Sequence, residues 1–129
     1  MSGAPIRRPP RGFTLVELLI VFTITAILAI LAFSTYSKFV TKARFTQAQT
    51  ALKHLQKTQA IFFSENGVYT DNVVLVGFEP TKYDFYNISV ALDNTSQDFT
   101  GVADGYGVMA GDRWHINRNG DSIHDTPNF

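Results

Sequence analysis

Hydrophobic residues fill the chain from Phe13 to Phe33, a stretch of 21 residues in which Glu17 is the only formally charged side chain. Built as a helix with a rise of about 1.5 Å per residue, this stretch is long enough to cross a hydrocarbon core of about 30 Å. A basic leader and a glycine precede the stretch, and no small-x-small cleavage site follows it. Because that order is the reverse of a secretory signal, we expect the stretch to be retained as a membrane span.

A second pattern follows from Ser34 to Ser64, where no glycine or proline interrupts the chain. Apolar residues recur there mostly three or four positions apart, which is the spacing of one helix face. Asn66-Gly67 then supplies a helix-ending signal. Together the two patterns predict one helix over about residues 13–64. Its predicted apolar stripe beyond the span consists of Tyr36, Phe39, Val40, Ala43, Ala48, Ala51, Leu52, Leu55 and Phe62.

The C-terminal part of the chain predicts strands. Residues 65–84 are loop-like, and the short β-forming runs that follow are separated by Gly, Asp and Asn. Asn119-Gly120 is a two-residue hairpin signal. We expect an antiparallel sheet of about four strands on the second half of the helix, anchored by burial of Trp114, Tyr106 and Phe85, which makes the fold class α+β. The strand candidates are residues 85–92, 99–103, 106–110, 113–117 and 121–124.

The distribution of charge is more informative than its total. Eleven basic and eleven acidic residues cancel, so no global basic excess indicates direct binding of nucleic acid. Residues 34–64 carry five basic side chains and no acid, whereas residues 65–129 carry ten acids against three basic side chains, a net of −7. Two interpretations of the basic helix face stay open. It is either a solvated flank or a surface complementary to the acidic part of a neighbouring subunit.

The orientation of the span follows from the arginines around it. Three arginines lie within residues 1–12, and three basic residues follow the span within residues 34–44, so the positive-inside count is nearly balanced. We expect the N-terminus inside because the arginines are denser and because the acidic, strand-rich part then lies outside.

Side chains suited to catalysis are scarce. The chain has no cysteine, which excludes disulfides, thiolate nucleophiles and Cys-based metal sites. No Ser-His-Asp order, paired-carboxylate cleft or glycine-rich phosphate loop is present. We therefore expect no enzymatic activity and no cofactor.

Metal binding is predicted to be absent, with two weak alternatives. His115 and His124 are placed to face each other across the last predicted hairpin, but no carboxylate stands at a fixed spacing from them. Asp112, Asp121 and Asp125 are the candidate ligands for calcium, although the segment lacks the bidentate glutamate and the spacing of an EF-hand.

Glu17 is the residue that most needs an explanation, because an unpaired carboxylate in a bilayer costs at least about 2.5–3.5 kcal/mol on insertion scales. If the chain were cut after Gly12, the new amino group of Phe13 would lie about one helical turn from Glu17. In an assembly, that ammonium could meet the Glu17 of a neighbouring subunit. Such a buried charge pair fixes the axial register of one helix on the next more reliably than it adds stability.

The motif GFTLVE at residues 12–17, after a basic leader and before an apolar helix, resembles the class III signal of type IV prepilins. The resemblance implies that a membrane prepilin peptidase cleaves after Gly12 and N-methylates Phe13, and that Glu17 directs assembly. Many pilins carry a glycine and a proline within the span. Ala26 and Ser34 stand at the corresponding positions here, so local melting of the helix in the filament is left open.

Residues 62–80 also resemble pilins, particularly those of deltaproteobacteria, in an aromatic pair near the helix end and a Gly-Phe-x-Pro turn before the first strand. The resemblance implies the type IV pilin fold. It also implies a cleaved leader at 1–12, a transmembrane and filament-core half-helix at 13–33, and the second half-helix with a β domain at 34–129.

A type IV pilin would be held in the inner membrane as a bitopic precursor and then polymerised with other pilin subunits into an extracellular filament, or fimbrium. The implied partners are the prepilin peptidase and N-methyltransferase, the assembly platform and its ATPases. Adhesion, twitching motility and DNA uptake are the implied functions, among which the sequence does not choose. Three alternatives stay open: a type II secretion pseudopilin, a minor pilin, and a monomeric membrane-anchored periplasmic binding module.

Overall fold

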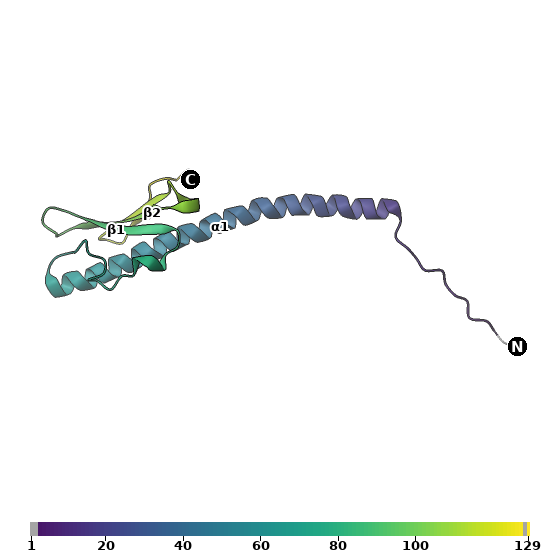
Figure 1. Cartoon of the computed structure of the whole chain (residues 1–129), viewed down its shortest axis with the longest axis horizontal. Coiled ribbons are helices and arrows are strands. Elements are labelled where there is room, and N and C mark those ends of the chain that lie inside the picture. Colours follow the sequence, from purple (N-terminus) through teal and green to yellow (C-terminus); the bar gives the residue numbers. More distant parts are fainter. Residues whose placement is uncertain (1–2, 128) are drawn as a thin grey trace. The chain divides into compact units, whose positions relative to one another are not determined.

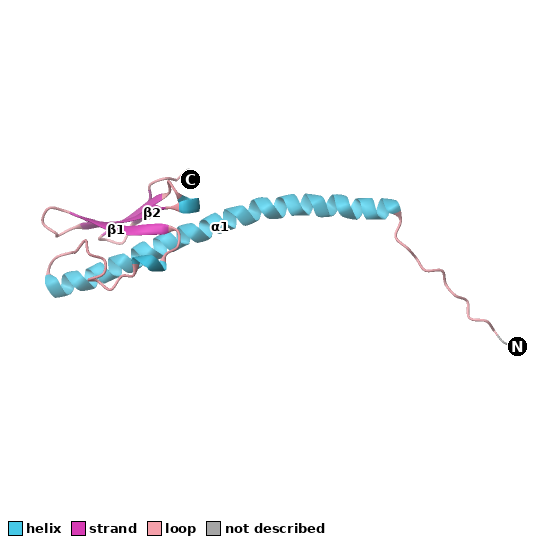
Figure 2. Cartoon of the chain, in the orientation of Figure 1, coloured by secondary structure: helices cyan, strands magenta, loops and turns pink. Residues whose placement is uncertain are grey.

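The computed structural model describes residues 3–127 and residue 129. The chain divides into two compact units, residues 1–39 and residues 40–129. One long helix and a four-stranded sheet make up the regular structure, which confirms the predicted α+β class (Figure 2). In chain order, the elements are α1 (Leu15–Asn66), the 3₁₀ helix η1 (Pro80–Lys82), β1 (Tyr86–Leu92), β2 (Phe99–Gly105), the 3₁₀ helix η2 (Gly107–Met109), β3 (Arg113–Asn117) and β4 (Ser122–His124).

Both ends of α1 are set by local hydrogen bonds. The side-chain Oγ1 of Thr14 accepts a hydrogen bond of 3.1 Å from the backbone N–H of Glu17, so Thr14 is the N-cap and the helix begins two residues after the predicted start at Phe13. At the other end, Gly67 adopts a φ of 73° and its N–H donates to the carbonyl of Phe63. This is the glycine termination that the sequence predicts.

The first unit leaves its apolar side chains uncovered. The most hydrophobic 18-residue window of α1 has a mean hydropathy of 2.7, and none of it is buried. By length and composition, α1 is able to cross a membrane. Thr23 and Thr25 bond their hydroxyls to the carbonyls of Leu19 and Val21, which satisfies these polar groups within the helix itself.

The second unit is an antiparallel sheet of strand order β1-β2-β3-β4, packed on α1 residues 40–66. Figure 1 shows β1 and β2 along one side of this part of the helix. The sheet and the helix approach closely at Gly101, where a Cβ would lie 2.8 Å from Cδ2 of Leu55. The core joins one helix face to one sheet face and contains Ala48, Ala51, Leu52, Leu55, Phe78, Tyr86, Ile88, Ala103, Met109, Trp114 and Ile116.

The predicted apolar stripe is therefore correct only in part. Ala48, Ala51, Leu52 and Leu55 are fully buried. Ala43 is exposed, because five residues turn a helix by about 140° relative to Ala48 and carry it away from the sheet. Tyr36 and Phe39, in the first unit, are 70% and 66% exposed.

The segment at residues 106–110, predicted as a strand, is not one. It contains η2, and Tyr106 is 42% exposed, so it does not anchor the sheet as expected. Gly107 adopts a φ of 60°, a turn conformation that breaks the extended run. Trp114 is buried and Phe85 packs partly buried against the core, as predicted.

The connection between β3 and β4 also differs from the prediction. The N–H of Gly120 donates to the carbonyl of Asn117 over 3.0 Å, and Asn117 in turn pairs with Asp121. The loop therefore has three residues, with Gly120 at a φ of 90° in the position of a bulge, rather than the two-residue turn predicted from Asn119-Gly120.

Candidate functional site

The first candidate site lies at the start of α1. Gly12 and Phe13 precede the helix in irregular backbone. Phe13 is 79% exposed, and a Cβ placed on Gly12 would meet nothing within 4 Å. The peptide bond between them is therefore accessible from solvent in this unit, as a cleavage site needs to be.

Glu17 lies in the first turn of α1 and is exposed. The positive end of the helix dipole favours a carboxylate at that place. Within the described residues no ion pair includes Glu17. Thr14 and Glu17 have the spacing of a capping box, which is the local sequence signal for this cap.

A second site, the Asp112 cluster, is buried between the sheet and α1. Asp112 is 1% exposed, and its two carboxylate oxygens accept hydrogen bonds from four side chains on β1, β3, β4 and the C-terminal segment. The donors are Tyr86 Oη at 2.5 Å, Trp114 Nε1 at 3.1 Å, Thr126 Oγ1 at 2.7 Å and His124 Nε2 at 2.6 Å.

Aromatic contacts join the Asp112 cluster to the helix. The ring of His124 stacks on Trp114 with centroids 4.1 Å apart and an interplanar angle of 6°. Phe45 of α1 lies 5.0 Å from His124 and 5.7 Å from Trp114. The C-terminal strand is thus fastened to both the sheet and the helix, in a chain with no cysteine to form a disulfide.

The electrostatics of the cluster favour a charged Asp112. Burial raises the pKa of this carboxyl. The hydrogen bonds from Tyr86, His124, Thr126 and Trp114 lower the pKa by more than burial raises it, so it lies below its ordinary value. Burial, together with the bond to Asp112, raises the pKa of Tyr86 far above its ordinary value, which keeps the phenol a proton donor. The cluster is a satisfied structural network rather than a proton-transfer site.

The calcium candidates do not come together. Asp112 is used by the cluster, Asp121 bonds to Asn117, and Asp125 lies 2.6 Å from Nδ1 of His115. Among the described residues, no three histidine or acidic side chains are placed to hold a metal ion.

His115 and His124, the weak alternative for metal binding, do not face each other across the last hairpin. His115 is opposite Ile123, and His124 is opposite Trp114. The three-residue loop shifts the register from the one assumed for a two-residue turn, so the two imidazoles have separate partners.

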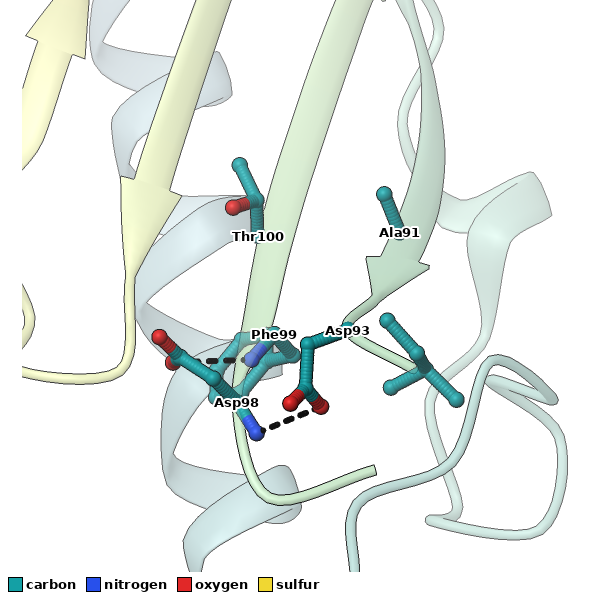
Figure 3. A pocket seen from close by; sticks show the side chains of 6 residues that line it. Ala91, Asp93, Asp98, Phe99 and Thr100 are labelled. Atoms are coloured by element: carbon teal, nitrogen blue, oxygen red, sulfur yellow. Dashed lines mark hydrogen bonds between the residues drawn. The ribbon is translucent and has the colours of Figure 1, made fainter. Parts of the chain in front are cut away.

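An open pocket of about 220 Å³ lies at the β1–β2 turn and is lined by residues 91–93 and 98–100. Figure 3 shows that its two carboxylates serve the turn itself. Asp93 accepts the N–H of Asp98 at 3.0 Å, and Asp98 accepts the N–H of Phe99 at 2.9 Å. Both acids are occupied by backbone donors, so the pocket offers no arrangement for chemistry.

Comparison with known families identifies the family of the chain. A family model described as a prokaryotic N-terminal methylation motif matches residues 7–33. A second model, described as the type IV minor pilin ComP, DNA uptake sequence receptor, matches residues 34–113, more than half of the chain. The chain belongs to the type IV pilin family. The predicted resemblance is thereby confirmed, and the family is one of structural subunits rather than enzymes.

Two curated proteins are similar in sequence to this pilin. The type IV major pilin protein PilA of Myxococcus xanthus (strain DK1622) is 41% identical over 81 residues, which is 63% of this chain. That match spans only 37% of the Myxococcus protein. The fimbrial protein EcpC of Eikenella corrodens is 26% identical over 108 residues, 82% of this chain and 71% of the relative.

Proposed function

We propose that this pilin is made as a membrane-held precursor, cut between Gly12 and Phe13, methylated on the new Phe13 amine, and polymerised into a surface filament. The observation that carries the proposal is the exposed junction at Gly12 and Phe13, directly before an apolar helix that ends its first turn with Glu17. The methylation-motif match over residues 7–33 supports it.

The exposed apolar surface of the first unit supports polymerisation. Leu15 is 81% exposed, Phe22 69% and Ile30 71%. A surface of this size is not stable in water, because exposing apolar area costs about 25 cal/mol per Å². Lipid covers it in the precursor, and the helices of neighbouring subunits cover it in the filament.

Glu17 then has a specific task in assembly. Glu17 lies in the first turn of α1, four residues after Phe13, whose amine cleavage would free. An ammonium from a neighbouring subunit neutralises the carboxylate where water is excluded, and the pair fixes the axial offset between subunits.

The filament acts outside the cell in adhesion, surface motility or DNA uptake, and the precursor spans the inner membrane with its N-terminus inside. The prepilin peptidase, the assembly platform and its ATPases are the partners of this route.

A second candidate is a minor pilin that receives DNA, which the family match over residues 34–113 favours. The charge of the second unit speaks against it. Seven basic residues stand against ten acids in residues 40–129, a net of −3. The third candidate function is that of a pseudopilin confined to a secretion system.

Replacing Glu17 by alanine tests the proposal. The hydrogen bond to Thr14 uses the backbone N–H of Glu17, so the helix cap survives the substitution. We expect membrane pilin to stay at its normal level and sheared filaments to fall at least about tenfold, because the carboxylate pair is lost. The matched control is Thr25→Ala, which removes a side chain that bonds only within its own helix, to Val21. Normal piliation in Glu17→Ala would contradict the pairing.

A further inference from the structure

The second unit leaves charges of opposite sign unpaired on two different sides. Two acids of the sheet region form ion pairs with arginines of the same chain: Asp104 with Arg113 at 2.5 Å, and Asp98 with Arg118 at 3.9 Å. Two other groups have no ion pair within the described residues. The lysine row is Lys42, Lys53 and Lys57 of α1. The acidic loop is the segment at residues 65–84, which begins in the last turn of α1 and carries Glu65, Asp71, Glu79 and Asp84.

The lysine row lies on the side of α1 turned away from the sheet. Its members are 4 and 11 residues apart, so they share one helix face, and all are exposed. Lys57 is two residues from the buried Leu55, a rotation of about 160° away from the core face. No acid occurs between residues 34 and 64 to neutralise the row.

The acidic loop follows a different side of the helix. Its backbone returns along α1 past His54, whose ring lies 5.5 Å from that of Phe78, and past Ile61, which lines a small pocket with Leu75. At about 100° per residue, that side is about 80–120° around the helix from Lys42 and Lys53, and about 40–60° from Lys57. With Lys82 included, residues 65–84 carry four acids and one base, a net of −3, against +3 on the row.

We infer that the lysine row of one subunit binds the acidic loop of the next subunit in the filament. The occupant is a second copy of this chain, because the two surfaces balance in charge and lie on different sides of one subunit. An open helical filament requires such a head-to-tail contact between two different surfaces, whereas a closed dimer uses one surface twice. Exposed Val74 and Leu75, 70% and 64% exposed, give the loop an apolar centre for the contact.

This inference rests on the proposed polymerisation and gives it a second contact. The Glu17 pair sets the axial offset, whereas the lysine row and the acidic loop set which sides of the two folded units meet. The ionic contact is open to solvent, so it is screened by salt and gives specificity more than affinity.

The test is charge reversal in cells that produce the full chain. We expect Lys53→Glu with Lys57→Glu to lower sheared filament about tenfold at unchanged membrane pilin, because like charges then face each other. Adding Glu79→Lys and Asp84→Lys to that variant should restore at least half of the filament. Lys82→Glu is the matched control: it reverses an exposed lysine within the acidic loop and should leave filament yield at or above the normal level.

The outcomes separate the two proposals. If the double lysine variant makes normal filaments, the proposed ionic contact is wrong. It is also wrong if the variant with all four substitutions does not regain filament. If Lys82→Glu is as defective as the lysine variant, the effect is one of general charge, and the contact is again wrong. Normal filaments that lose binding of a DNA duplex would assign the lysine row to phosphate instead. A filament defect in Glu17→Ala alongside any of these results leaves the proposed function intact.

Discussion

Leu28 in the first unit is 61% exposed, whereas Leu52 in the second unit is fully buried, although both belong to α1. The helix has the same backbone at both positions, so the difference comes from what covers it. In the second unit the chain supplies its own cover through the sheet. In the first unit no part of the described chain does so, and the cover has to come from lipid or from other subunits.

This difference separates the buried core from the exposed apolar helix. Substitutions in the core of the second unit should change the free energy of unfolding and leave the membrane precursor in place. Substitutions at the exposed apolar positions of the first unit should leave the free energy of unfolding unchanged. Trp114, the only tryptophan, lies in the second unit and reports on its unfolding by fluorescence.

The largest expected effect on stability is that of Asp112→Ala. Removing the carboxylate leaves the donors of Tyr86 and Trp114 buried without partners, and we expect the free energy of unfolding to fall by about 3 kcal/mol. Urea unfolding of the detergent-solubilised full chain, followed through Trp114 fluorescence, measures it. Asp121→Ala, at an exposed turn position, is the control and should cost less than about 1 kcal/mol.

The pH dependence of the free energy of unfolding gives a second test of Asp112. The pKa of Asp112 is lower in the folded chain than in the unfolded chain, so its contribution is present above the unfolded value of about 3.9. That contribution is lost as the pH falls through the folded value. In Asp112→Asn this part of the pH dependence should disappear. Equal loss of stability below about pH 4 in Asp112→Asn and the unsubstituted chain would contradict the role of the carboxylate.

Gln59→Leu should have an intermediate effect. Gln59 is fully buried, and its amide donates to the carbonyl of Thr70 at 2.5 Å while accepting the N–H of Thr70 at 3.3 Å. Leucine fills a similar volume but leaves both backbone groups unpaired, so we expect a loss of about 1–3 kcal/mol. The acidic loop should also exchange its amide hydrogens faster. Unchanged exchange at Thr70 would show that the pair does not hold the loop.

The smallest effect is expected for Phe39→Ser. Phe39 belongs to the first unit and is 66% exposed, so its loss should change the free energy of unfolding by less than about 0.5 kcal/mol. The same urea titration measures this. A clear destabilisation would mean that the first unit contributes to the folded core.

The sequence could predict the features that depend on neighbouring residues, but not the contacts between distant segments. The apolar run, the motif at residues 12–17 and the bounds of β3 depend on neighbours in the chain, and local patterns are sufficient for these. Tyr106–Ala110 has β-forming residues, but the turn at Gly107 overrides them. The partners of Asp112 come from four separate segments, and only the register of the sheet brings them together.

Intact mass spectrometry of material sheared from the cell surface tests the central claim most directly. The account predicts a dominant species that begins at Phe13 and carries one added methyl group. A chain found only in the membrane fraction, with residues 1–12 still attached, would contradict both cleavage and polymerisation.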